Sequence, residues 1–313
     1  MIAANAPANA SAIPSAGAHG GDGAAVAAAL GIAPEQLLDL SASLNPVAPD
    51  PVPVLAEHLR AATTRYPHPA RAEVALAEAI GVPAERLLLT NGGAQAIALV
   101  AAELGGSVRE PEFALHPRGT GPLWRSNPHS PSGRLAGPDE HAAIWDEAFY
   151  PLATGSWTRG DPDAVVVGSL TKLLAAPGLR AGYVLAEPDL VAACRRRQPA
   201  WSLGGLVTEA LPDLLARVDL AASARAVREL RAQLTTVLAG HGLSASPSDA
   251  NWVLVEYLGL RETLAPHGVL VRDCASFGLP GVARIAVPDA DGLSRLDTAL
   301  RHALRTTNQL GNP

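Results

Sequence analysis

The feature that most constrains the fold is a set of short, uninterrupted apolar runs that end at glycine, proline or asparagine. Leu87 to Thr90 leads into Asn91-Gly92-Gly93, after which an Ala-rich stretch has helical character as far as Leu104. Val165 to Val167 and Tyr183 to Leu185 are two more such runs. Because apolar residues follow one another instead of alternating with polar ones, these runs predict strands buried on both faces. We therefore expect the first two thirds of the chain to be α/β, with a mostly parallel sheet covered by helices.

The last third has a different pattern. After Trp201 the spacing of apolar residues predicts a long helical region to about residue 239, interrupted near Pro212. Three strands and a final amphipathic helix are then predicted, at Trp252 to Tyr257, Val269 to Arg272, Ala283 to Val287 and Leu293 to Leu304. This order of elements indicates a small α+β domain.

These patterns divide the 313 residues into three expected parts. Residues 1–18 are rich in Ala, Asn, Pro and Ser, and we expect them to form a mobile arm. Residues 19–205 form the expected large domain, in which residues 19–45 pack near the site. Residues 206–313 form the expected small C-terminal domain.

Composition argues against several classes of protein. The formal charge of -6 disfavours a nucleic acid or an anionic membrane as partner, because both are bound through concentrated Lys and Arg. Arg195-Arg196-Arg197, the one basic cluster, is interpreted as a solvated helix face. No apolar run is long enough to span a bilayer, and Cys194 and Cys274 form no closely spaced pair. The nine histidines show no metal-binding spacing. We expect a cytoplasmic enzyme without a metal.

Lys172 is the only lysine in a chain that otherwise uses arginine for positive charge. Arginine cannot replace lysine in imine chemistry, because its delocalised guanidinium stays protonated. A surface lysine without a role is the alternative. The neighbours favour the chemical role, since Ser169 offers a hydroxyl and Arg180 a guanidinium suited to a phosphate. Pyridoxal phosphate carries both an aldehyde and a phosphate, and would use both features.

Two further features fit this cofactor. Asp146 follows apolar residues at an expected strand end, where α/β sheets bind ligands, and a carboxylate there can keep a pyridine nitrogen protonated. The alternative for Asp146 is a solvated loop carboxylate. Asn91-Gly92-Gly93-Ala94 is a glycine turn that opens a helix, and N–H groups at a helix start attract phosphate. On its own this turn is a weak signal, because many strand-to-helix turns look the same.

These motifs occur together in one order along most of the chain. The array consists of Asn91-Gly92, Asn127-Pro128-x-x-Pro131-x-Gly133, Asp146-Glu147-Ala148-Phe149, Ser169-x-x-Lys172 and Pro177-Gly178-Leu179-Arg180. It resembles the aspartate-aminotransferase-like, fold type I enzymes that depend on pyridoxal phosphate. Within them the chain is most similar to the branch of the threonine-phosphate decarboxylases of cobalamin biosynthesis and the histidinol-phosphate aminotransferases. That likeness adds His19-Gly20-Gly21, Leu38-Asp39-Leu40-Ser41, Asn45-Pro46, Arg65-Tyr66-Pro67, Trp201-Ser202 and Arg272-Asp273-Cys274.

The resemblance implies roles for individual residues toward the cofactor. Lys172 would form the imine with pyridoxal phosphate, Asp146 would pair with the ring nitrogen, and Asn127 would hydrogen-bond the ring hydroxyl. His116 stands where relatives carry an aromatic ring that stacks on the cofactor. The remaining implied contacts are to the phosphate, from Ser169, Arg180, the amides of Gly93 and Ala94, and Tyr66 of a second subunit. We therefore expect a homodimer.

Other residues are implied to bind the substrate, expected to be a small phosphorylated amino acid. Arg284 would bind the carboxylate, and Arg272 with His19 would bind the phosphate. A structural role on a strand is the alternative for both arginines, and His19 could belong to the arm. Ser43 stands where the decarboxylase pattern has an asparagine that helps to hold substrate.

The sequence also departs from the family pattern. Gly204 and the pair His129-Ser130 replace asparagines of that pattern. Only eleven steps separate His116 from Asn127, too few for a full crossover, so the large domain is expected to be trimmed. Phe149 lies where typical aminotransferases have a tyrosine.

Phe149 favours decarboxylation, with L-threonine O-3-phosphate as first candidate substrate and 1-aminopropan-2-yl phosphate as product. Transamination of the histidinol-phosphate type is the first alternative, because the same residues serve it. The second alternative is a homologue that binds the cofactor and has lost catalysis.

Overall fold

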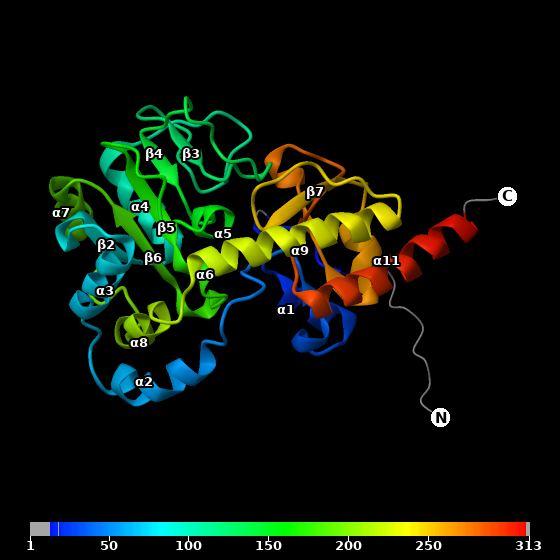
Figure 1. Cartoon of the computed structure of the whole chain (residues 1–313), viewed down its shortest axis with the longest axis horizontal. Helices are drawn as coiled ribbons and strands as arrows, with labels where there is room; N and C mark the ends of the chain where they lie inside the picture. The colour runs from blue at the N-terminus through cyan, green and yellow to red at the C-terminus, as the bar shows by residue number, and fades with distance from the viewer. Residues whose placement is uncertain (1–12, 18, 311–313) are drawn as a thin grey trace. The chain divides into compact units, whose positions relative to one another are not determined.

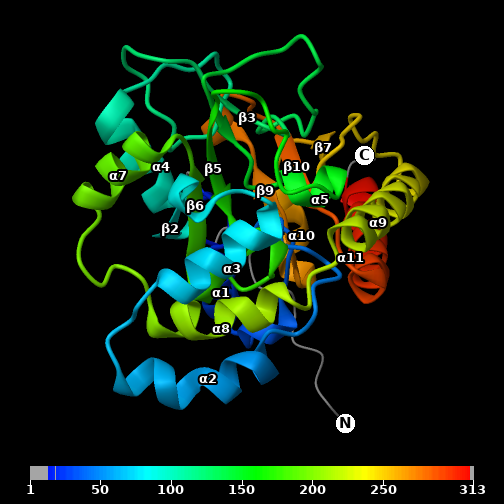
Figure 2. The same ribbon diagram turned by 60° about the vertical axis from the view of Figure 1, so that its left-hand side comes forward.

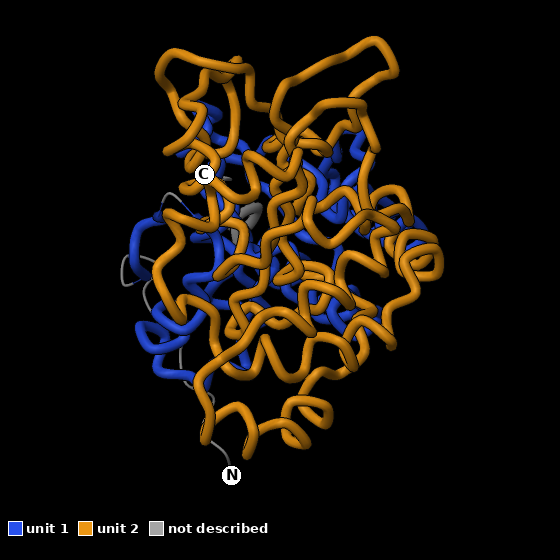
Figure 3. Tube along the Cα trace, turned by 90° about the vertical axis from the view of Figure 1, so that its left-hand side faces the viewer, with its two compact units in different colours: residues 1–43, 228–313 blue, residues 44–227 orange. Residues whose placement is uncertain are grey.

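The computed structural model describes residues 13–17 and 19–310 (Figure 1). Most of the expected arm at residues 1–18 lies outside the described residues. The chain divides into two compact units (Figure 3). Unit 1 consists of Met1–Ser43 and Arg228–Pro313, and unit 2 of Leu44–Val227.

Unit 2 contains a five-stranded sheet. Its strands lie in the order β2 (Leu87–Asn91), β6 (Ala181–Leu185), β5 (Val165–Ser169), β4 (Ile144–Asp146) and β3 (Trp124–Ser126). β3, β4 and β5 pair in parallel, whereas β6 is antiparallel to both β2 and β5. Four of the five strands therefore run in one direction, and the predicted α/β fold with a mostly parallel sheet is confirmed.

Both faces of this sheet are buried, as the continuous apolar runs predict. Alternate residues of the strands face opposite layers: Leu87 and Leu89 pack in one apolar cluster and Leu88 in the other. One face is covered by α3 (Ala70–Ile80) and α8 (Gly205–Leu215), and the other by α4 (Gly92–Leu104) and α7 (Pro188–Arg197) (Figures 1 and 2). Such double coverage explains why these strands have no polar side.

The other elements of unit 2 are shorter or lie outside these two layers. α2 packs against α8 and buries Val54. The stretch between β3 and β4, residues 127–143, contains no helix. These elements are α2 (Val52–Thr64), η3 (Ala84–Arg86), α5 (Tyr150–Thr154), α6 (Leu170–Leu173) and η4 (Pro177–Leu179).

Unit 1 is built around two small sheets. Antiparallel strands lie in the order β7 (Trp252–Glu256), β10 (Val282–Ala286) and β9 (Arg272–Asp273), and β1 (Leu38–Asp39) pairs in parallel with β8 (Val269–Leu270). Two long helices, α9 (Leu220–Gly240), of which the part from Arg228 onward belongs to this unit, and α11 (Ala290–Leu310), contribute Leu234, Leu238, Leu296 and Leu300 to the same core. The predicted strands at Trp252 to Tyr257 and Ala283 to Val287 and the final helix are confirmed. The one strand predicted at Val269 to Arg272 is instead divided into β8 and β9, which belong to different sheets. Its shorter helices are α1 (Gly23–Leu30), η2 (Pro34–Gln36), α10 (Leu260–Leu264), η5 (Ala265–His267) and η6 (Ala275–Phe277).

The two units do not follow the domain boundaries expected from the sequence. Residues 19–43 group with the C-terminal part of the chain, because β1 pairs with β8 and Val26 of α1 packs beside Leu270. Residues 206–227 group with unit 2, because α8 packs against α2 and α3.

The helical region after Trp201 breaks later than the expected interruption. Pro212 lies inside α8, and the break follows at residues 216–219. Leu211, Leu214 and Leu215 are buried in the core of unit 2, and this packing stabilises the helix beyond the proline. Of the helices in the described part of the chain, none is both long enough and apolar enough to cross a membrane.

Candidate active site

The topology of unit 2 brings the expected cofactor residues to one edge of the sheet. Asn127 follows β3, Asp146 ends β4 and Ser169 ends β5. Because these three strands are parallel, their carboxyl ends lie at the same edge. β6 is antiparallel, so Arg180, which directly precedes it, also lies there. Ligands of open α/β sheets bind at this edge.

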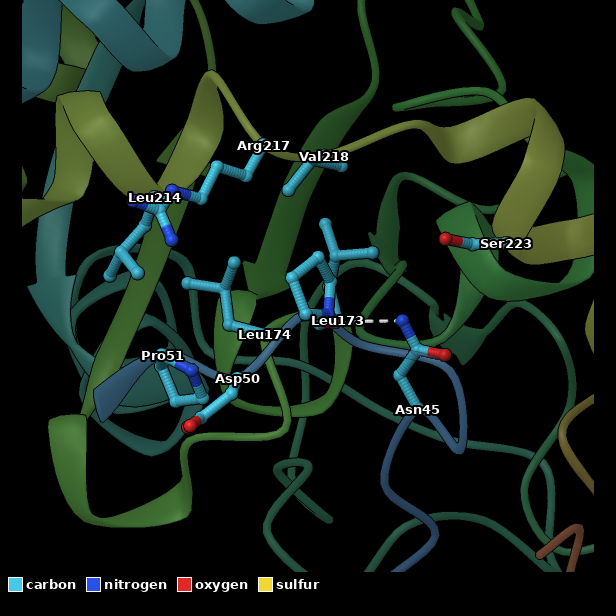
Figure 4. A pocket seen from close by; sticks show the side chains of 10 residues that line it. Asn45, Asp50, Pro51, Leu173, Leu174, Leu214, Arg217, Val218 and Ser223 are labelled. Atoms are coloured by element: carbon cyan, nitrogen blue, oxygen red, sulfur yellow. Dashed lines mark hydrogen bonds between the residues drawn. The ribbon is translucent and has the colours of Figure 1, made fainter. Parts of the chain in front are cut away.

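Lys172 lies in α6, the single helical turn that follows β5. Asn45, which lies far away in the sequence, forms two hydrogen bonds to this turn. Its backbone N–H donates to the carbonyl of Lys172 at 3.0 Å. Its Nδ2 donates to the carbonyl of Leu173 at 3.0 Å (Figure 4). The Nζ atom of Lys172 lies 5.8 Å from the centre of the Phe149 ring. The backbone of the lysine is therefore fixed by Asn45.

The carboxylate of Asp146 is buried and held by two donors. Oδ1 accepts the backbone N–H of Ala148 at 3.0 Å, and Oδ2 lies 3.0 Å from Nε2 of His116. A carboxylate accepts, so the proton of this bond belongs to Nε2 of the imidazole. The sequence predicts that His116 stacks on the cofactor. In the structure its ring donates a hydrogen bond to Asp146.

Asn127 presents a donor beside Asp146. Its backbone N–H donates to the carbonyl of Asp146 at 2.8 Å, and its Oδ1 accepts the N–H of Ala136 at 3.0 Å. The side chain is 1% exposed, and among the described residues Nδ2 has no hydrogen-bond partner. A buried amide donor without a partner costs free energy, so it indicates an acceptor atom supplied by a ligand.

Two glycines at the start of α4 make room for side chains with phosphate-binding chemistry. A Cβ on Gly92 would lie 2.3 Å from Nη2 of Arg180, and one on Gly93 would lie 3.3 Å from Cβ of Ser169. Arg180 and Ser169 therefore touch the first turn of α4. Asn91, the cap residue, forms no side-chain hydrogen bond to that turn in the described structure, so the N–H groups of the turn are available to an anion.

These observations fit pyridoxal phosphate on several independent counts. A guanidinium, a hydroxyl and helix N–H groups form a cup suited to a phosphate. Asp146 offers a buried carboxylate and Asn127 an unpartnered amide donor, which suit the ring nitrogen and the ring oxygen of the cofactor. The only primary amine on a side chain, that of Lys172, belongs to the same edge of the sheet.

Glu147, for which the sequence suggests no role, is buried beside Asp146. Burial raises the pKa of its carboxyl group to about 7, and the nearby charges of Asp161 and Asp146 add to this rise. Oε1 accepts the N–H of Arg159 at 3.1 Å, and Oε2 has no hydrogen-bond partner among the described residues. Glu147 can therefore exchange a proton near neutral pH.

Tyr66, expected to reach a second subunit, is exposed on the surface of unit 2. Its ring is 78% exposed and lies 4.9 Å from the ring of Trp201, which is 66% exposed. Trp201 has a positive φ of 56°, an unusual backbone conformation for a bulky side chain. Large exposed aromatic rings of this kind occur at protein interfaces.

Two buried arginines lie side by side in unit 1. Arg272 of β9 and Arg284 of β10 are directly opposite each other in the antiparallel register. Both guanidiniums lie near the ring of Phe277, at 4.5 and 6.0 Å, and Arg284 also lies 4.8 Å from the ring of Trp252. Burial, with the neighbouring charge of Arg272, lowers the pKa of Arg284 to about 9. Two like charges in this position destabilise the fold unless an anion neutralises them.

The other expected substrate residues also lie in unit 1. Ser43 is fully buried with a φ of 51°, its carbonyl accepts Nδ2 of Asn251 at 2.8 Å, and its Oγ has no partner among the described residues. His19 is exposed, and partial burial together with the charge of Arg272 lowers its pKa. Within the described residues, no cluster of three His, Cys, Asp or Glu side chains has the geometry of a metal site.

Comparison with known proteins places the chain in a family. The family model described as aminotransferase class I and II matches residues 114–300. The chain therefore belongs to the class I and II aminotransferase family, whose members bind pyridoxal 5'-phosphate. It shares the aspartate-aminotransferase-like α/β architecture of fold type I: a histidinol-phosphate aminotransferase from Sinorhizobium meliloti, solved with pyridoxal-5'-phosphate, has a TM-score of 0.71 at 16% identity, covering 85% of this chain and 90% of that one.

Two curated relatives narrow the family to one branch. Threonine-phosphate decarboxylase of Salmonella typhimurium is 30% identical over 92% of this chain and 96% of its own length. Histidinol-phosphate aminotransferase 1 of Nitrosococcus oceani is 26% identical over 79% of this chain and 84% of its own length. The chain thus falls in the branch of the histidinol-phosphate aminotransferases and threonine-phosphate decarboxylases, as the sequence motifs predict. Histidinol-phosphate aminotransferases predominate among the similar curated proteins.

Proposed function

We propose that this protein binds pyridoxal 5'-phosphate at the carboxyl edge of the unit 2 sheet and transaminates a small phosphorylated amine of the histidinol-phosphate kind. The observation that carries the proposal is the convergence of Lys172, Asp146, Asn127, Ser169 and Arg180 on that edge. The number of aminotransferases among the relatives gives transamination preference over decarboxylation, which the sequence alone had placed first.

Each cofactor residue has a role that follows from its chemistry. Lys172 would hold the aldehyde carbon, Asp146 the protonated ring nitrogen and Asn127 the ring oxygen. Ser169, Arg180 and the first N–H groups of α4, at Gly93 and Ala94, would hold the phosphate. When bound, the cofactor withdraws electrons from the Cα atom of the substrate.

The amine of Lys172 would also move a proton. With pyridoxal phosphate and substrate bound, Nζ of Lys172 would serve as the general base that accepts the proton of the substrate Cα, and as the acid that returns it. The hydrogen bonds from Asn45 keep the backbone of Lys172 in place while its side chain moves.

Arg272 and Arg284 would bind the anionic groups of the substrates. Both guanidiniums are buried, and a phosphate or carboxylate would neutralise the repulsion between them. An aminotransferase must bind an anionic group on each of its two substrates, because an amino acid or its oxo acid serves as the second substrate. His19 and Ser43 complete the proposed substrate set.

Decarboxylation of L-threonine O-3-phosphate is the second candidate, and one residue favours it. Phe149, three residues after Asp146, lies 5.8 Å from Nζ of Lys172 and has no hydroxyl to donate to the cofactor ring oxygen. The Salmonella typhimurium decarboxylase is also similar over nearly the whole chain.

We further infer a homodimer, in which Tyr66 contributes to the cofactor phosphate site of the partner. The exposed pair of Tyr66 and Trp201 supports this inference, because aromatic rings are enriched at protein interfaces.

The test is a single-turnover experiment on protein loaded with pyridoxal phosphate. Histidinol phosphate and threonine phosphate are added separately, and pyridoxamine phosphate and carbon dioxide are measured. Transamination predicts one pyridoxamine phosphate for each site and no carbon dioxide with histidinol phosphate. Carbon dioxide from threonine phosphate without pyridoxamine phosphate would establish the second candidate. Cofactor binding without any turnover would indicate a homologue that has lost catalysis.

A further inference from the structure

Glu112 is a buried carboxylate that the proposed chemistry leaves without a role. Its side chain is almost completely buried in unit 2. Oε1 accepts the N–H of Phe113 at 2.8 Å, and Oε2 accepts the N–H of Ser126 at 3.0 Å. The hydroxyl of Ser126 forms a third, very short hydrogen bond with Oε1.

The direction of this third hydrogen bond is fixed by its surroundings. Oγ of Ser126 also accepts the backbone N–H of Ser130 at 2.7 Å. Its own proton is therefore free to point at Glu112, which receives three donated hydrogen bonds in total. Both oxygens of Glu112 therefore act as hydrogen-bond acceptors.

His116 lies between this carboxylate and Asp146. Its Nε2 is 3.0 Å from Oδ2 of Asp146, and its Nδ1 is 3.7 Å from Oε1 of Glu112. The imidazole is inaccessible to solvent, and Nδ1 has no hydrogen-bond partner within the described part of the chain. If Nδ1 carried only a lone pair, that lone pair would face a buried anionic oxygen. If it carries a proton, the contact becomes attractive.

We infer that Glu112 is a positioning residue that keeps His116 doubly protonated, so that an imidazolium holds Asp146 ionised and oriented. The three groups then carry one net negative charge. A protonated pyridine nitrogen bound by Asp146 would neutralise it, and this last step rests on the proposed function. Glu112 thereby extends the cofactor site two residues beyond Asp146, through His116.

Several other charged groups face this relay of Glu112, His116 and Asp146. The carboxylate of Glu110 interacts electrostatically with His116, and Arg118 donates to the carbonyl of His116 at 2.7 Å. On the far side, Glu147 interacts electrostatically with Asp146, and with a pKa of about 7 its carboxyl group is negatively charged only in part at neutral pH. The two acidic neighbours act in the same direction as Glu112, and the guanidinium of Arg118 is engaged with Glu110 at 2.7 Å.

The relay also borders a surface pocket. Glu112 lines a pocket of about 300 Å³ at the β3 edge of the sheet, together with Trp124, Arg125 and His129. His129 is bound elsewhere in this pocket, through Ser132 at 2.8 Å and the carbonyl of Pro111 at 2.9 Å. Of the three side chains of the relay, only that of Glu112 lines this pocket.

The test reads the protonation of His116 directly. In ¹⁵N-labelled, cofactor-free full-length protein, long-range ¹H–¹⁵N spectra distinguish an imidazolium from the two neutral tautomers, and His116→Gln assigns the signal by its disappearance. At neutral pH we expect both ring nitrogens of His116 to carry protons. Glu112→Gln should remove the proton from Nδ1 and leave the one on Nε2. Glu110→Gln, which removes a charge from the same pocket, should leave the imidazolium in place.

Two results would overturn the inference: a neutral His116 in the unaltered protein, or an imidazolium that persists in Glu112→Gln. Should Glu112→Gln fail to fold, a neutral His116 in the unaltered protein would still overturn the inference. Because no cofactor is present in this experiment, its outcome is independent of whether the chain binds pyridoxal phosphate.

Discussion

Replacing Gly92 with alanine tests the phosphate cup at the start of α4. The added Cβ would lie 2.3 Å from Nη2 and 2.9 Å from Cζ of Arg180, well inside contact distance. The guanidinium is the end of a flexible, exposed side chain, so it would move away and relieve the clash. The backbone would stay strained, because Gly92 has a φ of +73°. Gly92→Ala should therefore displace Arg180 from the cup.

Two separate costs follow from this geometry. An L-residue in the left-handed region costs about 1–2 kcal/mol in the free energy of unfolding. Loss of a charge-assisted hydrogen bond to the phosphate costs about 1.5–3 kcal/mol in binding. The second figure corresponds to a dissociation constant for pyridoxal phosphate that is roughly 10- to 150-fold higher.

The assay separates the two costs with one control and two ligands. Gly81→Ala is the matched control, because Gly81 has a φ of +83° with no atom within 4 Å of the added Cβ. Both variants should lose similar stability in chemical unfolding, but only Gly92→Ala should bind pyridoxal phosphate more weakly. Pyridoxal, which lacks the phosphate, should bind both variants alike. If Gly92→Ala titrates with pyridoxal phosphate as Gly81→Ala does, the cup has been assigned wrongly.

Three more predictions concern single side chains. Lys172→Ala should abolish the imine absorbance of the bound cofactor, while phosphate-dependent binding, measured by equilibrium dialysis, remains. Unchanged imine absorbance would rule out Lys172 as the residue that forms the imine. Glu147 has its pKa raised from 4.5 to about 7, so the folded state holds a proton that the unfolded state loses, and stability falls as pH rises from 4.5 to 7. At about 1.36 kcal/mol per pKa unit, Glu147→Gln should recover about 3 kcal/mol above pH 7 and none below pH 4.5 in urea unfolding curves; a constant difference across this range would refute the assignment. Arg284→Met should stabilise the ligand-free protein by about 1–4 kcal/mol, because a buried cation is removed, and should reduce the rise in Tm that phosphate ions produce; a lower Tm without ligand would contradict this.

The strands of the sheet could be predicted because the local sequence pattern indicates that they are buried. Leu87 to Thr90 and Val165 to Val167 have no polar side, and this is the pattern of strands covered on both faces. The position of Ser169 at a strand end follows from the second of these runs, and that of Asp146 from the apolar residues that precede it. The parallel direction of β3, β4 and β5 then explains why these residues gather at one edge.

Contacts between distant segments could not be predicted in this way. His116 was expected to stack on the cofactor, and nothing in the local sequence indicates that its ring reaches Asp146, thirty residues away, or that Glu112 lies behind it. The pairing of Arg272 with Arg284 depends on the register of β9 and β10, which only the folded sheet fixes. The grouping of residues 19–43 with the C-terminal part depends likewise on the pairing of β1 with β8.

The most direct test of the central claim is to reduce the protein with borohydride in the presence of pyridoxal phosphate and to locate the adduct by peptide mass spectrometry. Lys172 is the only lysine, so the N-terminal amine is the sole competing primary amine. We predict one stable pyridoxyl group per chain, on the peptide that contains Lys172. No adduct, or an adduct at the N-terminus alone, would contradict the assignment of this edge of the sheet as a pyridoxal-phosphate site.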